Sequence, residues 1–229
     1  MPRQVLAGVV AAVAALTLSG CGAAGPGVAA KVGDRTVTTS DVDRLTEGYC
    51  RALEGQIKSQ GQVVPLRLVR TYVAGSLTLQ AAAQQLAAQN GIAEPDGYLD
   101  EVKTNESQSE QLPAAHRADY VEVASAQDYV VAVERQLGGR LLLDEGKPDA
   151  TDDQKVARGR EELSVWFGDH TLDVNPKYSF EIADGTVKNI SNDTSYALSD
   201  NAVAAGKFSS DSGPDQAYSA SLPASQRCG

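Results

Sequence analysis

The sequence predicts a mainly α-helical protein with a small β element of two or three strands. Several stretches place apolar residues at the three- and four-residue spacing of a buried helix face. Helix-ending signals such as Asn90-Gly91 separate these stretches from one another. Only two short stretches, near residues 30 and 178, alternate apolar and polar residues as strands do. Helices must therefore supply most of the core.

The first expected element is a short hairpin. Residues Ala29 to Val37 alternate in part around Gly33-Asp34, which predicts two short strands joined by a tight turn. A helix is expected from about Asp41 to Ser59, because apolar residues recur there at helical spacing. Ser40, with Asp43 three places on, resembles the N-cap of this helix.

Four further helices are predicted along the chain. The second begins at Pro65, since proline suits the first helical turn, and ends at Asn90-Gly91. Its wide apolar face indicates a helix that is buried on two sides or left partly open to a partner. The fourth helix is expected to stop at Gly138-Gly139, and Thr151 is expected to cap the fifth. The last three helices are expected over about residues 95–109, 113–139 and 153–167.

The C-terminal part of the chain differs in composition from the helical part. Residues Thr171 to Ile182 have strand character, with apolar residues alternating towards the end. Beyond Gly185 the chain grows rich in Ser, Asn, Asp, Gly and Ala. From about Ser191 we expect little regular structure apart from what a disulfide holds.

The N-terminal segment ends in Leu18-Ser19-Gly20-Cys21, which has the form of a bacterial lipobox. One positive charge precedes the apolar run from Val5 to Leu18, which is too short to span a bilayer, since that takes about 20 residues. The pattern predicts an export signal over residues 1–20, lipidation of Cys21 and a flexible tether over residues 21–28. The alternative is an ordinary secretory signal with a cysteine nearby by chance. The lipobox predicts a lipid-anchored protein on the extracytoplasmic face of the cell membrane.

The chain is acidic, with 30 Asp and Glu against 20 Lys and Arg and a formal net charge of −10 at pH 7. Removal of the signal takes one arginine and makes the mature charge one unit more negative. Because nucleic-acid binding needs Lys and Arg to displace counterions, this charge argues against such a partner. It also argues against a basic patch on anionic lipids, so we expect the acyl chains to carry the membrane contact.

Two cysteines remain beside the lipidated one, Cys50 and Cys228. An even pair in an exported protein favours one disulfide, which would fasten the C-terminus to the first helix. Closing so long a loop contributes about 4–5 kcal/mol in the chain-entropy model. The alternative is two separate thiols, one buried in a helix and one free on the tail.

Residues that could carry catalysis are scarce. The chain has two histidines, His116 and His170, and no Gly-x-Ser-x-Gly frame surrounds a serine. Both histidines are expected on the surface. Asp169, His170 and Asp173 lack a third nitrogen or thiol ligand, and typical zinc spacing is absent. We therefore expect no enzyme activity, no cofactor and no metal.

Five aromatic residues are spaced as core residues of helices: Tyr49, Tyr72, Tyr120, Tyr129 and Trp166. We expect core packing for each of them. The alternative is that one or two of them line a groove for another chain. The spacing does not distinguish which.

Two segments resemble the SurA N-terminal domain family, whose members open with a hairpin of the form V-N-G-x-x-I-T-x-S-D-L that leads into the first helix. Within residues 30–43, Asp34 is displaced relative to the usual asparagine. The residues that fit are Val32, Gly33, Val37, Thr38, Ser40, Asp41 and Val42. Residues 173–178, with the sequence DVNPKY, resemble the closing strand of the family. The two matches bracket residues 29–182.

This resemblance implies a helical domain over residues 29–185, in which the first hairpin strand pairs with the late strand. It also implies an apolar surface that receives unfolded segments of exported proteins. Residues 186–229 would form a polar tail. Relatives often carry a parvulin peptidyl-prolyl isomerase domain, for which the segment from Gly138 to Ala150 has no room.

The sequence therefore predicts a lipid-anchored, chaperone-like protein that binds exported client polypeptides without isomerase activity. An acidic exterior would keep such a protein soluble while its binding surface stays apolar. The alternative is a structural or assembly lipoprotein of the cell envelope that binds one fixed protein partner. Neither hypothesis involves enzyme activity.

Overall fold

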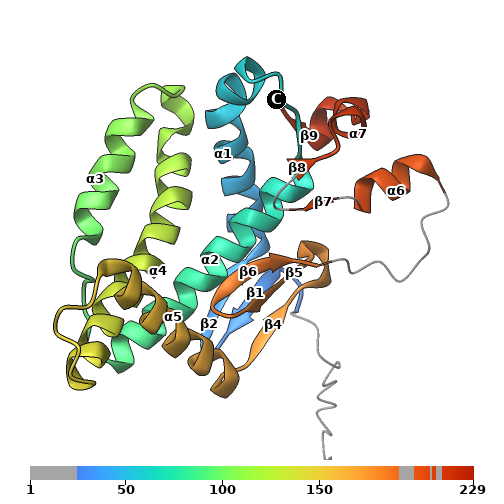
Figure 1. The fold of residues 1–229 in the computed structure, drawn as a ribbon. Helices are drawn as coiled ribbons and strands as arrows, with labels where there is room; N and C mark the ends of the chain where they lie inside the picture. The colour runs from blue at the N-terminus through green and yellow to red at the C-terminus, as the bar shows by residue number, and fades with distance from the viewer. Residues whose placement is uncertain (1–24, 191–198, 207, 210–212) are drawn as a thin grey trace, which may run out of the picture.

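The computed structural model describes residues 25–190, 199–206, 208–209 and 213–229. Helices dominate this part of the chain, and the β structure consists of small antiparallel sheets of two or three strands. The predicted mainly-α class is therefore confirmed (Figure 1). The five main helices are α1 (Thr39–Ser59), α2 (Leu66–Gln89), α3 (Tyr98–Ser109), α4 (Arg117–Asp144) and α5 (Asp152–Asp169).

The N-terminal hairpin forms the largest described sheet together with a late strand. Strand β1 (Val28–Val32) lies between β2 (Arg35–Thr38) and β4 (Leu172–Val174), and both pairings are antiparallel. Ala30 sits opposite Val37 on one side and Val174 on the other. The expected pairing of the first hairpin strand with a late strand is thus confirmed, and it joins segments about 140 residues apart.

Helix α1 begins earlier than its expected cap. The hydroxyl of Thr38 accepts a hydrogen bond from the backbone N–H of Asp41 at 3.1 Å, which makes Thr38 the N-cap. The assignment of Ser40 as the cap is wrong, because Ser40 already lies in the first helical turn. Strand β2 runs directly into the helix, so the last strand residue supplies the capping oxygen.

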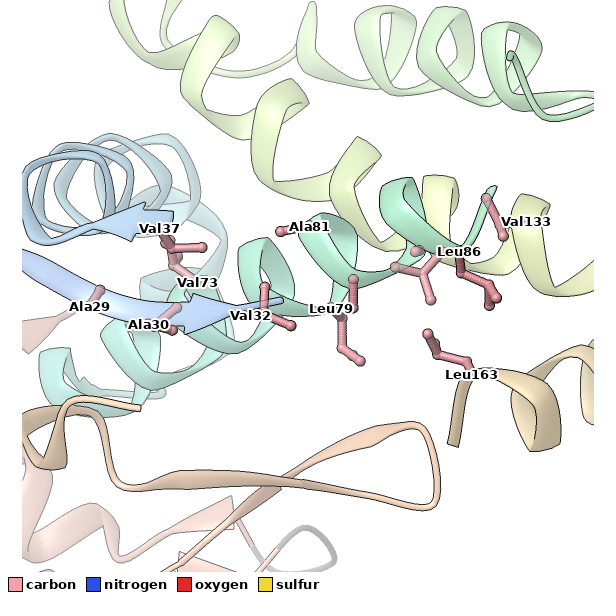
Figure 2. Packing of buried hydrophobic residues seen from close by; sticks show 14 of the residues in the cluster. Ala29, Ala30, Val32, Val37, Val73, Leu79, Ala81, Leu86, Val133 and Leu163 are labelled. Atoms are coloured by element: carbon pink, nitrogen blue, oxygen red, sulfur yellow. The ribbon is translucent and has the colours of Figure 1, made fainter. Parts of the chain in front are cut away.

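Helix α2 occupies the centre of the fold. It ends before Asn90-Gly91 as predicted, but it begins at Leu66, because Pro65 precedes the helix as its N-cap and is not in the first helical turn. Helices α1, α4 and α5 and the strands β1 and β2 all contact it. Small residues let these elements approach closely, since Ala74, Ala82 and Ala83 are fully buried. Figure 2 shows the core that results, in which Val73, Leu79 and Leu86 of α2 lie beside Val32 and Leu163.

Helix α3 starts later than expected, and α4 ends later. Gly97 adopts a left-handed conformation before Tyr98, so α3 begins three residues after the expected start at residue 95. Helix α4 continues through Gly138-Gly139 to Asp144, so the predicted stop at these glycines is wrong. The glycines lie where α4 packs against α5. Thr151 caps α5 in a capping box with Gln154, and the predicted cap is confirmed.

The stretch predicted as one strand near residue 178 is divided. After β4 comes a single 3-10 turn (Pro176–Tyr178), and then strand β5 (Phe180–Ala183) pairs with β6 (Thr186–Asn189). Asp184 and Gly185 join these strands with φ values of 54° and 66°, the conformation of a tight two-residue hairpin turn. The β5–β6 hairpin thus crosses residue 185, where the helical domain was expected to end, and it packs on α2.

The C-terminal segment contains more regular structure than the composition predicts. The expectation of little regular structure after Ser191, apart from what a disulfide holds, is wrong for the described residues, because two short helices and a further strand pair form there as well. Strand β9 (Arg227–Cys228) pairs with β3 (Val64–Pro65), just before α2. The other elements are α6 (Asp200–Gly206), β7 (Phe208–Ser209), β8 (Gly213–Pro214), α7 (Gln216–Ser221) and a 3-10 turn (Ala224–Gln226).

Candidate functional site

An almost entirely apolar hollow of about 270 Å³ lies between α1, α2 and the C-terminal segment. On α1, Tyr49, Leu53 and Ile57 recur every four residues and so share one helix face. On α2, Leu68 and Tyr72 have the same spacing and face them. We call this site the tyrosine hollow. The rest of its lining comes from Cys50, Val64, Val69, Pro214 and Cys228.

Two tyrosines line the hollow, Tyr49 and Tyr72, and the expectation of core packing is wrong for Tyr72, whereas Tyr49 packs against the core with one side. The ring of Tyr49 lies 5.9 Å from that of Tyr72, and it stacks on Tyr120 at 5.8 Å between centroids. Tyr72 is 42% exposed, whereas Trp166 is 4% exposed and is the one of the five predicted aromatics that is buried. Tyr129 is half-buried. The tyrosine hollow therefore presents aromatic surface to the solvent.

The hollow carries no charge at neutral pH. Burial raises the pKa of Tyr49 far above its usual value of 10.0, and Tyr72 and Tyr120 nearby add to the effect. Burial also raises the pKa of Tyr72. Both phenols stay protonated, so the site offers apolar and aromatic contact and has no ionised nucleophile among its lining residues. The lining of the hollow is therefore suited to binding a ligand.

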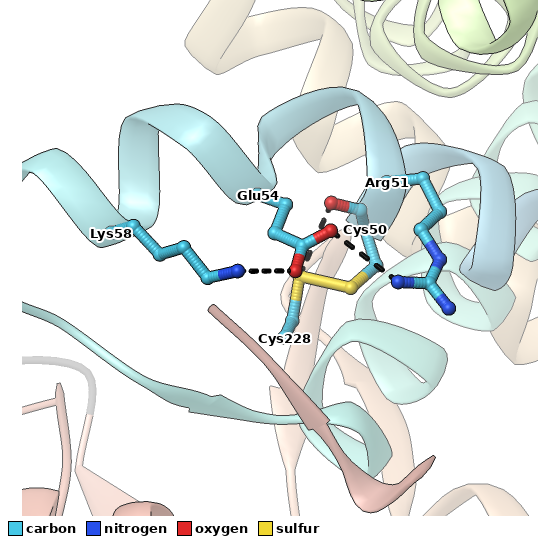
Figure 3. Close-up of a disulfide and its surroundings, with 5 residues drawn as sticks. All are labelled: Cys50, Arg51, Glu54, Lys58 and Cys228. Atoms are coloured by element: carbon cyan, nitrogen blue, oxygen red, sulfur yellow. Dashed lines mark hydrogen bonds and ion pairs between the residues drawn. A yellow bond between two sulfur atoms is a disulfide. The ribbon is translucent and has the colours of Figure 1, made fainter. Parts of the chain in front are cut away.

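The C-terminal wall of the hollow is held in place covalently. Cys50 on α1 and Cys228 on β9 form a disulfide with their Cα atoms 5.6 Å apart, the pairing that the cysteine count favours over two separate thiols (Figure 3). Beside it Glu54 accepts hydrogen bonds from Lys58 at 2.6 Å and from Arg51 at 3.4 Å. These exposed ion pairs add little stability. The disulfide and the β3–β9 pairing fasten the wall.

A second cavity of about 470 Å³ adjoins the tyrosine hollow, because Leu68 and Tyr72 line both. It lies between α2, α4 and the β5–β6 hairpin. At its far end Arg160 donates hydrogen bonds from Nε and Nη2 to the two carboxylate oxygens of Glu134, at 3.3 Å and 3.1 Å. Glu134 is 2% exposed. Burial raises the pKa of this carboxyl, and the Arg160 hydrogen bond partly opposes that rise.

Sequence reasoning missed Glu134 and Arg160. Glu134 follows Val130 and Val133 in the apolar stripe of α4, where a solvent-facing carboxylate is not expected. The signal that could have revealed this ion pair is a charged residue at a core position of a helix, because a buried charge needs a partner of opposite sign. Nothing in the local sequence identifies that partner, since Arg160 lies 26 residues away on another helix.

The two histidines are both half-buried. His170 stacks on Trp166 with 3.9 Å between ring centroids, and its Nδ1 donates to the carbonyl oxygen of Trp166 at 2.8 Å. His116 sits at the N-cap of α4. Among the described residues, no group of three or more His, Cys, Asp or Glu side chains could hold a metal ion. The histidines therefore take part in packing and helix ends within the region that the structure covers.

The predicted lipidation site, Cys21, and the export signal lie outside the described residues. Within the part of the chain that is described, no helix combines the length and the apolar character needed to cross a membrane. Comparison of the chain with protein-family models, curated proteins and solved structures found no match.

Proposed function

We propose that this chain is a lipid-anchored, extracytoplasmic chaperone-like protein that binds apolar segments of exported polypeptides, without isomerase activity. The observation that carries the proposal is the tyrosine hollow, an uncharged apolar site that opens beside the exposed ring of Tyr72. The lipobox at Cys21 supports the location. The resemblance of residues 30–43 and 173–178 to the SurA N-terminal domain family supports the class of ligand.

The size of the hollow defines what it accepts. Pockets for drug-sized ligands measure about 300–1,000 Å³, and the hollow has about 270 Å³. It therefore takes a few apolar side chains and leaves the rest of a polypeptide outside. Complete burial of one large apolar side chain contributes about 1.5–3 kcal/mol. Binding by one hollow is weak and reversible, which suits a protein that holds unfolded chains and releases them without ATP.

The test is suppression of aggregation of a denatured protein by the mature chain, without ATP. The unchanged protein should slow aggregation at stoichiometric excess. Tyr72→Ala should reduce the effect, and Tyr72→Phe should keep it, because the ring and not the hydroxyl makes the contact. Leu99→Ala is the matched control, since Leu99 is 48% exposed on α3 and does not line the hollow. No suppression by the unchanged protein would refute the proposal.

The membrane anchor is tested separately. Cells that express the full chain are labelled with a fatty acid, and the protein is followed into the detergent phase. The chain should carry the label, and Cys21→Ser should remove it and release the protein from the membrane fraction. A labelled Cys21→Ser variant would contradict the lipobox assignment.

The second candidate is an envelope lipoprotein with one fixed protein partner. A small hollow with one wall held by a disulfide favours a short, specific ligand segment. A photo-crosslinking residue at position 72 in intact cells separates the two functions. One dominant adduct would indicate a fixed partner, whereas adducts with many exported proteins would indicate a chaperone. The same residue at position 99 serves as the control.

A further inference from the structure

The tyrosine hollow and the second cavity adjoin each other along α2, and we call the two together the trough. They share Leu68 and Tyr72, and the second cavity extends along α2 to Leu79. At 1.5 Å per residue, Leu68 and Leu79 lie about 16 Å apart along the helix axis. An extended polypeptide advances about 3.3 Å per residue, so about five residues span this length.

The two ends of the trough differ in chemistry. The hollow end is uncharged and lined by apolar and aromatic side chains. The far end holds Arg160, whose side chain is 40% exposed, while that of its partner Glu134 is 2% exposed. A ligand in the trough therefore meets the guanidinium, and the carboxylate lies behind it. The trough is apolar at one end and presents hydrogen-bond donors at the other.

The guanidinium of Arg160 is held in position from two sides. Glu134 engages its Nε and Nη2 from α4. The turn of the β5–β6 hairpin lies against its stem, because a Cβ at Gly185 would come within 2.7 Å of the Arg160 Cγ. Among the described residues, Nη1 has no hydrogen-bond acceptor. A fixed guanidinium with a free donor edge suits a carboxylate, because little side-chain freedom remains to be lost on binding.

We infer that the trough binds an extended segment of about five residues whose carboxylate contacts Arg160 and whose apolar side chains enter the tyrosine hollow. This inference rests on the proposed function and names the ligand within it. The carboxylate is either the C-terminus of a polypeptide or an Asp or Glu side chain. Glu134 is a positioning residue, since its carboxylate hydrogen-bonds Arg160 and orients the guanidinium.

The test uses fluorescent hexapeptides and the mature protein, with binding followed by anisotropy. One peptide carries several leucine and phenylalanine residues and a free C-terminal carboxylate. The second has the same residues and a C-terminal amide. The third is amidated and carries one glutamate near its end. The free acid should bind about tenfold tighter than the plain amide, as a charge-assisted hydrogen bond predicts. Recovery by the third peptide would assign the carboxylate to a side chain.

The decisive variant is the double substitution Glu134→Gln with Arg160→Gln, which removes both charges and leaves neither buried alone. It should bind all three peptides equally, at the affinity of the plain amide. Arg140→Gln is the charge-matched control, because Arg140 is exposed on α4 and does not line the trough. Circular dichroism and thermal unfolding establish that each variant is folded.

The outcomes separate this inference from the proposed function. Equal binding of acid and amide by the unchanged protein, with loss of both in Tyr72→Ala, would overturn the role of Arg160 and leave the hollow intact. A preference for the acid that survives in the double variant would also overturn it. Absence of binding by every peptide, together with no suppression of aggregation, would refute the proposed function itself.

Discussion

A Cβ atom at Gly138 of α4 would lie 1.9 Å from the carbonyl oxygen of Lys155 on α5. The relation is reciprocal, because a Cβ at Gly159 of α5 would lie 1.9 Å from the carbonyl oxygen of Glu134 on α4. The two helices therefore meet backbone to backbone at this point. Only glycine permits such an approach, and the close packing brings Glu134 and Arg160 into contact at one end of the trough.

Gly138→Ala should destabilise the protein by about 1–3 kcal/mol or more, because the methyl group forces two backbones apart. Gly139→Ala is the matched control. A Cβ there would meet only the Lys155 side chain at an ordinary 3.5 Å, and alanine favours the helix by about 1 kcal/mol over glycine. Urea unfolding measures both. Equal effects of the two substitutions would contradict the close contact at Gly138.

Loss of the disulfide should lower the free energy of unfolding by about 2–5 kcal/mol. The bond joins residues 178 positions apart, and the chain-entropy model assigns the largest effects to long loops. The comparison is urea unfolding of the unchanged protein with and without a reductant, alongside Cys50→Ala with Cys228→Ala. Reductant should have no effect on the double variant. A drop caused by reductant in that variant would show that another bond is responsible.

Arg160→Gln should destabilise the protein more than Glu134→Gln. Removal of the arginine leaves a carboxylate that is 2% exposed without a cation, whereas removal of the carboxylate leaves an arginine that reaches solvent. Breaking a buried pair costs about 3–5 kcal/mol, and the lower end applies because Arg160 is partly exposed. Urea unfolding at neutral pH tests the order. The reverse order would mean that Glu134 does not need its partner.

The same carboxyl should give the protein a measurable acid response. Because burial raises the folded-state pKa of Glu134 above 4.5, the folded protein holds this proton more tightly than the unfolded chain does. Its contribution to stability is therefore full below the unfolded pKa and is lost as pH rises through the raised folded pKa. The destabilisation by Arg160→Gln should shrink as pH falls towards 4.5, as urea unfolding across this range would show. A constant difference would contradict a buried ionised carboxylate.

Ionisation of the Tyr49 phenol should lower the stability of the folded protein at alkaline pH. Its folded-state pKa lies well above the usual 10.0 because of burial, so stability holds below pH 10 and falls as pH rises beyond it. Tyr49→Phe should reduce this loss of stability at alkaline pH. Thermal unfolding measures the stability, and phenolate absorbance measures the ionisation. Tyr218→Phe is the control, since Tyr218 lies on α7 outside the hollow. An unchanged alkaline profile in Tyr49→Phe would contradict burial of the hydroxyl.

Helix boundaries could be predicted where a local signal has one meaning. The Thr151 cap and the Asn90-Gly91 stop both act through residues within one turn, and the structure has both where they are predicted. Gly138-Gly139 carries two meanings, because glycine ends helices and also permits close packing. Only the position of α5 distinguishes them. The tyrosines show the same limit, since helical spacing places Tyr72 on a face but does not say what covers it.

Short-range patterns along the chain were sufficient for the helical class, for the hairpin that opens the domain and for the cysteine pair. These features depend on neighbouring residues or on composition, and the amino-acid sequence alone contains both kinds of information. The trough depends on contacts between distant segments: α1 with β9 at its hollow end, and α4 with α5 at Arg160. Burial of a side chain is set by what packs against it. Folding, and not local propensity, therefore decided that Tyr72 faces solvent while Glu134 lies buried beneath a guanidinium.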